Sequence, residues 1–174
     1  FVTEIQKKSG KEGTIQLSML QLLGSLLQVV IQTGFNPAKL YNGANLYDDL
    51  LKVREPEEMM NWFETVAIAP YLNELNEVQD SYLKKLVAST TELIHRQYKH
   101  DISLEACAEM LGTSTVKLSN GFKQVMGINF IDYLTQVRID KVKQLLIHTD
   151  MKIHDIALEV GYQPTYFNRI FKKQ

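Results

Sequence analysis

Two groups of polar and basic residues lie 49 positions apart, and their spacing gathers side chains on one face of a helix. In the second group, Thr165, Asn168 and Arg169 stand at i, i+3 and i+4. Arginine can donate two hydrogen bonds to a guanine, asparagine can pair with an adenine, and lysine or serine near a helix start suits phosphate oxygens. The candidate binding residues are Ser114, Thr115, Lys117, Ser119, Asn120 and Lys123 in the first group, and Gln163, Thr165, Tyr166, Asn168, Arg169 and Lys172 in the second.

The two groups are expected to differ in what they contact. Arg169 is the residue best suited to read a base, and the alternative roles for it are a phosphate contact or a surface salt bridge. The residues expected mainly to hold phosphates are Ser114, Lys117, Lys123 and Lys172.

A repeat in the sequence indicates how these residues are positioned. The pattern A-x-x-[LV]-G-x5-[LF]-x3-F-K occurs at Ala108–Lys123 and again at Ala157–Lys172. Each copy predicts a short helix, a turn at Gly112 or Gly161, and a second helix, which Ser114 can cap in the first copy. This is the pattern of a helix-turn-helix, whose second helix enters the DNA major groove. One copy alone would fit an ordinary helical hairpin equally well.

A long helix is expected between the copies, over 129–149. Asn129 is a suitable cap, Asp132 adds negative charge to the first turn, and neither Gly nor Pro follows until the next copy. About 18–20 helical residues span about 27–30 Å. Because successive major grooves on one face of DNA are about 34 Å apart, such a helix would hold two recognition helices in successive grooves, with some bending of the DNA.

With these motifs in place, Asp101–Lys173 resembles the DNA-binding domain of the AraC family. The resemblance rests on the segments Ile102–Ala106, Gly127–Arg138 and Val160–Lys173. It implies a seven-helix unit with two helix-turn-helix motifs joined by one long helix. It also implies double-stranded DNA as the partner and transcription regulation as the function.

Two features depart from the family pattern. The second motif has one residue fewer than many members between Gly161 and the Tyr166–Phe167 pair. In the first recognition helix, Gly121 is expected either to make the helix pliable, at a cost of about 1 kcal/mol relative to Ala, or to let a neighbouring element approach closely. We therefore expect the first motif to be the weaker reader of sequence.

The remaining sequence predicts an all-α fold, because no segment has the period of a strand. Residues 14–33 form the most apolar stretch, but four Gln interrupt it, which favours a buried or partner-covered helix ending at Gly34 over a membrane span. Pro56 is expected to begin a helix that Pro70 ends. We expect a helical signalling or oligomerisation module at 1–76 and an AraC-type DNA-binding domain at 77–174, without the last short helix of the family.

Charge and composition limit the other functions. Residues 1–79 hold six Lys and Arg against ten Asp and Glu, and residues 80–174 hold thirteen against ten. The four His are scattered and Cys107 is expected in a core, so no catalytic site, metal or cofactor is predicted. A single cysteine suits a reducing cytoplasm.

Two interpretations remain. The first is a cytoplasmic, sequence-specific regulator that binds double-stranded DNA, contacts RNA polymerase, and uses 14–76 for homodimerisation or for contact with a sensor domain, without membrane contact in this segment. Such a chain would suit the cytoplasmic part of a membrane-anchored regulator. The second is a helical protein-interaction module built on a degenerate helix-turn-helix scaffold.

Overall fold

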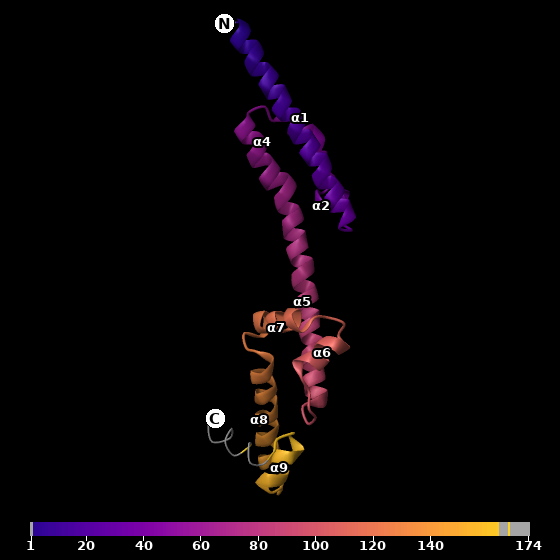
Figure 1. Ribbon diagram of the computed structural model, residues 1–174, viewed down its shortest axis with the longest axis vertical. Coiled ribbons are helices and arrows are strands. Elements are labelled where there is room, and N and C mark those ends of the chain that lie inside the picture. Colours follow the sequence, from indigo (N-terminus) through magenta and orange to yellow (C-terminus); the bar gives the residue numbers. More distant parts are fainter. Residues whose placement is uncertain (1, 164–166, 168–174) are drawn as a thin grey trace. The chain divides into compact units, whose positions relative to one another are not determined.

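The computed structural model describes the backbone of residues 2–163 and 167, and the side chains of residues 13–163 and 167 (Figure 1). Within these residues every regular element is helical, which confirms the all-α prediction. The chain divides into two compact units, unit 1 at 1–79 and unit 2 at 80–174.

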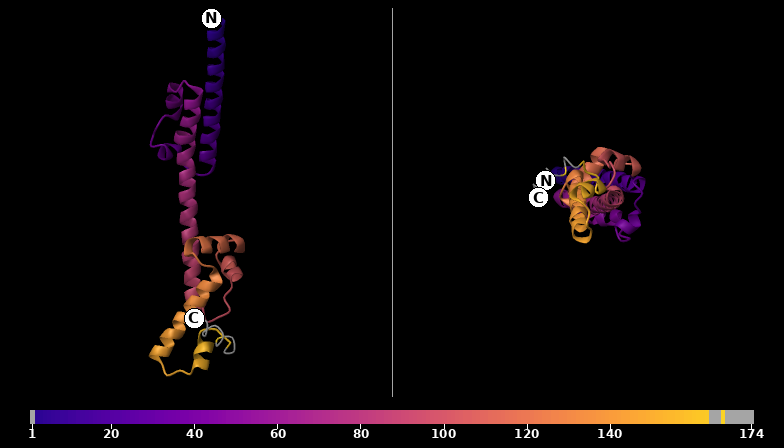
Figure 2. Two further views of the ribbon diagram at one scale, coloured as in Figure 1. Left: turned by 90° about the vertical axis from the view of Figure 1, so that its left-hand side faces the viewer. Right: turned by 90° about the horizontal axis from the view of Figure 1, so that it is seen from below.

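Unit 1 is built on α1 (Val2–Gln32), which lies beside α4 in both views (Figures 1 and 2). The other elements are α2 (Pro37–Leu40), α3 (Leu46–Lys52), α4 (Pro56–Trp62), η1 (Phe63–Ile68) and the first part of α5 (Ala69–Gln97). Their core contains Met19, Leu23, Tyr41, Leu46, Leu50, Met59 and Ala67. A glycine ends α1 as expected, because Gly34 has a φ of 89° and Phe35 N–H donates to the Val30 carbonyl at 3.1 Å.

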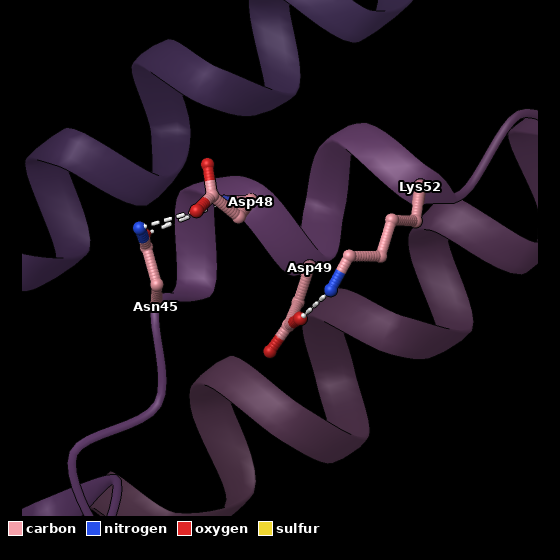
Figure 3. A network of polar contacts seen from close by, with 4 residues as sticks. All are labelled: Asn45, Asp48, Asp49 and Lys52. Carbon is pink, nitrogen blue, oxygen red and sulfur yellow. Dashed lines mark hydrogen bonds and ion pairs between the residues drawn. The ribbon is translucent and has the colours of Figure 1, made fainter.

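The short helix α3 is held at its start by a reciprocal cap (Figure 3). Asn45 Oδ1 accepts a hydrogen bond from Asp48 N–H at 3.4 Å, and Asn45 Nδ2 donates to the Asp48 carboxylate at 2.6 Å. Lys52 Nζ lies 2.7 Å from Asp49 Oδ1 near the other end. These local contacts allow a seven-residue helix to hold Leu46 and Leu50 in the core of unit 1.

Pro70 does not end the helix that begins at Pro56, contrary to the sequence expectation. The chain stays helical from α4 through the π-helix η1 into α5. At the end of η1, Ala69 N–H donates to the Glu64 carbonyl, five residues back. The wider π turn accommodates a residue without N–H, so that Pro70 lies within a continuous helical path.

By length and composition, Gly13–Gln32 of α1 could cross a membrane, with a mean hydropathy of 1.6. The core of a folded protein can produce the same signal. Met19 and Leu23 lie in the core of unit 1, and Val30 is also fully buried. Only 17% of this stretch is buried, however, so most of its surface faces outward.

Unit 2 contains the rest of α5, then α6 (Leu104–Met110), α7 (Thr115–Met126), α8 (Phe130–His148) and α9 (Ile153–Glu159). Figure 2 shows α8 running from the end of α7 to α9. One hydrophobic core packs α5, α6, α7 and the first half of α8 around Ile94, Leu118 and Phe122. A second core joins Val142 of α8 to Ile156 of α9 and to Phe167.

Candidate nucleic-acid interface

The sequence repeat is also a repeat of backbone geometry. Gly112 and Gly161 both adopt left-handed conformations, with φ of 63° and 81°. The residue after each glycine donates its N–H to the carbonyl five residues back, which is the Schellman turn that ends a helix. These bonds join Thr113 to Ala108 at 2.9 Å and Tyr162 to Ala157 at 2.9 Å. Each first helix therefore ends in the same way, 49 residues apart.

The buried side chains repeat as well. Three pairs of residues that correspond at this interval are fully or almost fully buried in both copies, namely Ala108 and Ala157, Cys107 and Ile156, and Leu118 and Phe167. Val160 is also fully buried, whereas its counterpart Leu111 is half-buried. Small Ala108 allows close packing of α6 and α7, as a helix-turn-helix requires. The prediction of two such motifs joined by a long helix is confirmed for the described part of the chain. The candidate residues Thr165, Tyr166, Asn168, Arg169 and Lys172 lie outside the described residues, whereas Gln163 is described and is exposed.

The helix α7 has two distinct faces. Leu118, Gly121 and Phe122 are buried against the core of unit 2. On the opposite side, four exposed residues fall at i, i+3, i+4 and i+7, namely Val116, Ser119, Asn120 and Lys123. We call these four residues the α7 outer face. It presents hydroxyl, amide, ammonium and aliphatic groups side by side.

Val116 is the member of this face that sequence reasoning did not select. Its side chain is 71% exposed, although it is aliphatic. The repeat contained the signal, because Val116 lies 49 residues before the candidate Thr165. Valine cannot hydrogen-bond to a base, but its aliphatic group can contact the methyl group of a thymine.

The start of α7 carries the other candidates. Ser114 Oγ accepts a hydrogen bond from Lys117 N–H at 3.3 Å and caps the helix, as expected. Thr115 is half-buried. The Lys117 ammonium lies 4.4 Å from the ring centroid of Tyr82 in α5, a cation–π contact. Lys117 therefore turns toward α5 and does not join the α7 outer face.

Gly121 lies in close contact with a side chain of α5. A Cβ atom at this position would overlap the side chain of Leu83 in α5, meeting its Cδ1 and lying 3.1 Å from its Cγ. Of the two roles considered for Gly121, the structure supports the close approach of a neighbouring element. At Gly121 the buried side of α7 therefore packs closely against α5.

The linker helix α8 has the expected bounds and cap. Asn129 Oδ1 accepts from Asp132 N–H at 2.8 Å, and Asn129 Nδ2 donates to the Asp132 carboxylate at 2.6 Å. With 19 residues, α8 is about 28 Å long. This length agrees with the strut that the sequence predicted between the two motifs.

Arg138, near the middle of α8, fixes the second motif to the end of α5. Its Nε donates to the Tyr98 carbonyl at 2.8 Å and its Nη2 to the His100 carbonyl at 3.0 Å. Its guanidinium carbon lies 5.0 Å from the ring centroid of Tyr162, which follows the turn at Gly161. Beside it, Lys99 forms an ion pair with Glu159 of α9. Sequence reasoning used this arginine only as part of a motif.

The described residues offer little for other chemistry. No group of three or more His, Cys, Asp and Glu that could hold a metal ion occurs among them. Burial raises the pKa of the Cys107 thiol, which suits a core residue better than a nucleophile.

Comparisons with known proteins agree with this geometry. A family model described as a helix-turn-helix domain matches residues 107–174. The uncharacterized HTH-type transcriptional regulator YtdP of Bacillus subtilis (strain 168) is 28% identical over 159 residues, which are 91% of this chain and 21% of that protein. The lactose operon transcription activator of Staphylococcus xylosus is 32% identical over 97 residues, 55% of this chain and 35% of that protein. The chain thus spans only a minor part of either relative.

A solved structure extends the similarity to the fold. The C-terminal domain of AraT, a response regulator from Geobacillus stearothermophilus, is 41% identical, with a TM-score of 0.50. The match covers 51% of this chain and 74% of that one. Through its C-terminal half, the chain therefore belongs to the AraC family of helix-turn-helix transcriptional regulators and carries the DNA-binding domain of that family.

Proposed function

We propose that this chain is the DNA-binding part of a sequence-specific transcription regulator that places α7 and the second recognition helix in successive major grooves. The observation that carries the proposal is the repeated turn geometry at Gly112 and Gly161, with α8 as a strut about 28 Å long between the motifs. The small difference from the groove spacing of about 34 Å is taken up by bending of the DNA.

The α7 outer face supplies the base contacts of the first motif. Val116 contacts a thymine methyl group, and Asn120 and Ser119 bond to base edges. Lys123 and the capped start of α7 at Ser114 hold phosphates. In the second motif, the residues assigned from the sequence are Gln163, Thr165, Tyr166, Asn168, Arg169 and Lys172, with Arg169 as the base reader and Lys172 as a phosphate contact.

The rest of the proposal concerns the whole protein. The relatives above are named as transcription regulators, which supports a regulator without enzymatic activity in this chain. Residues 1–76 transmit a signal or make a dimer contact, and the domain acts in the cytoplasm, where DNA and RNA polymerase are accessible. The similarity to YtdP over 91% of the chain supports a common role for both units.

A selection from random duplex DNA tests the proposal. The expected result is an enriched site whose footprint covers two successive major grooves, with binding that weakens steeply as salt rises. A footprint over one groove that no change at Ser114–Asn120 affects would refute the role of the first motif. Failure to enrich any sequence would favour the interaction-module interpretation.

Removing single methyl groups from the DNA tests the contact proposed for Val116. Within the selected site, each thymine is replaced by uracil, which removes only the methyl group. One of these replacements should weaken DNA binding by the wild-type protein by about 1 kcal/mol or less, since roughly one methyl contact is lost. The same replacement should not change DNA binding by the Val116→Ala variant. Equal effects on both proteins at every thymine would exclude the contact.

A further inference from the structure

The outward side of α1 carries a regular row of uncharged polar residues. They are spaced alternately by four and three positions, so they form a straight seam along one side of the helix. All of them are exposed, and we call them the α1 seam: Thr14, Ser18, Gln21, Ser25, Gln28 and Gln32.

Exposed aliphatic residues border this seam. Ile15, Leu22 and Val29 recur every seven residues along one edge, and Leu17 and Ile31 lie along the other. A repeat of seven is the spacing at which one helix stays in contact with another as the two coil together. The opposite side of α1 is already occupied by the core of unit 1.

The same side of α1 lacks charge. From residue 13 to residue 32 there is no Asp, Glu, Lys or Arg, although these residues make up 22% of the chain. Only 17% of this stretch is buried, and a helix face in contact with water normally carries charged residues. Depletion of charge together with exposed aliphatic side chains is the composition found at the centre of a protein interface.

We infer that the α1 seam of one chain packs against the α1 seam of a second copy. In a two-fold symmetric pair the same patch is used on both chains, so charges near the axis would meet like charges. The Ser18 and Ser25 hydroxyls donate to carbonyls of their own helix but can still accept, and the Gln amides both donate and accept, so identical rows of Ser and Gln can pair with one another. A charged partner would find no opposite charge on this face.

A lipid bilayer fits the same face poorly. The amides of Gln21, Gln28 and Gln32 would enter hydrocarbon without partners, at a cost of several kcal/mol for each unsatisfied group. Insertion would also require Met19 and Leu23 to leave the core of unit 1.

The size of the seam indicates a weak dimer. The α1 seam covers a strip of about 28 Å by 10 Å on each chain. Two such strips would bury less than about 1,200 Å² in total, and protein interfaces of that size are transient. Two copies bound to adjacent sites on one DNA molecule would have a high effective concentration and would dimerise there. The inference deepens the proposed function, because it names the partner of unit 1, but the contact between chains does not require DNA.

Charge substitutions in the seam test the inference on the full chain by sedimentation velocity over a range of concentrations. The double variant Gln21→Glu with Gln28→Glu should weaken self-association on the order of tenfold or more, because like charges then face each other. The double variant Gln21→Lys with Gln28→Lys should do the same. The matched control, Asn76→Asp with Gln79→Glu on the exposed side of α5, should associate like the wild type.

Mixing the Glu and Lys variants provides the decisive measurement. Opposite charges then meet across the seam, and association should return to at least the wild-type level. A wild-type chain that remains monomeric at all concentrations, or a dimer that none of these changes affects, would overturn the inference. Co-sedimentation of the monomeric wild type with phospholipid vesicles would assign the face to a membrane instead. Binding of each variant to the selected DNA reports separately on the proposed function.

Discussion

Replacing Gly161 and Gly112 by alanine, one at a time, would measure how tightly the second motif is held against the backbone that follows α5. The two glycines occupy the same position in the repeat and both have positive φ, so an alanine is strained at either. They differ in what surrounds them. A Cβ at Gly112 meets nothing within 4 Å, whereas a Cβ at Gly161 would lie 2.6 Å from the carbonyl oxygen and 2.9 Å from the carbonyl carbon of Lys99.

The expected magnitudes follow from this difference. The left-handed conformation costs an L-residue about 1–2 kcal/mol, and this is the whole effect expected for Gly112→Ala. At Gly161 the clash is with backbone, which cannot move aside like the end of a side chain, and overpacking adds about 1–3 kcal/mol. Gly161→Ala should therefore destabilise unit 2 by about 2–5 kcal/mol.

Equilibrium urea unfolding gives these free energies, with one probe in each unit. The only tryptophan, Trp62, lies in unit 1, and the only cysteine, Cys107, is buried in unit 2. Pulsed labelling of the Cys107 thiol therefore follows unfolding of unit 2, while Trp62 fluorescence follows unit 1. Gly127→Ala, which also has positive φ and open surroundings, is a second control and should behave like Gly112→Ala.

Equal effects of the two substitutions would refute the reasoning. If Gly161→Ala and Gly112→Ala lower the stability of unit 2 by the same amount, the turn of the second motif does not lie close enough to the Lys99 backbone for a Cβ to clash with it. A greater loss for Gly112→Ala would contradict the argument outright.

Three further substitutions test the interface. Arg138→Ala should cost about 1.5–3 kcal/mol, because two backbone carbonyls lose a charged donor, and Arg138→Lys should recover only part of this in urea unfolding. Lys123→Gln should weaken binding on every DNA sequence and lower the slope of log K against log salt by roughly one unit; an unchanged slope would remove it from the interface. Gly121→Ala should destabilise α7 packing by only about 1 kcal/mol, because the obstructing atom is the end of the Leu83 side chain, and about 1 kcal/mol of helix propensity should offset this loss. Adding Leu83→Ala should relieve the clash, and strictly additive losses would argue against it.

The parts of the fold that depend on local sequence could be predicted. Helix caps and glycine turns can be predicted from single residues and their immediate neighbours. The structure has the predicted caps at Ser114 and Asn129 and the predicted turns at Gly112 and Gly161. The linker helix follows from the same signals, since an uninterrupted helix begins at a cap and ends where its pattern stops.

The parts that depend on contacts distant in sequence could not be predicted. A glycine in a helix gives no sign of the Leu83 side chain that lies against Gly121 from a different helix. Arg138 looks like any surface arginine until the carbonyls of Tyr98 and His100 are placed beside it. The helix through Pro70 was mispredicted for a related reason, because a π turn leaves no pattern in the side chains.

These distant contacts together determine where the two motifs lie within unit 2. The first motif is set on α5 near Leu83 through Gly121, and the second is set on the end of α5 through Gly161 and Arg138. From Leu83 to Gln97, α5 covers about 21 Å, beside α8 with about 28 Å. The distance between the motifs is thus fixed by two helices and not by the linker alone. Because two helices together resist bending more than one, we expect the proposed two-groove binding to require that the DNA, and not unit 2, adjusts its shape.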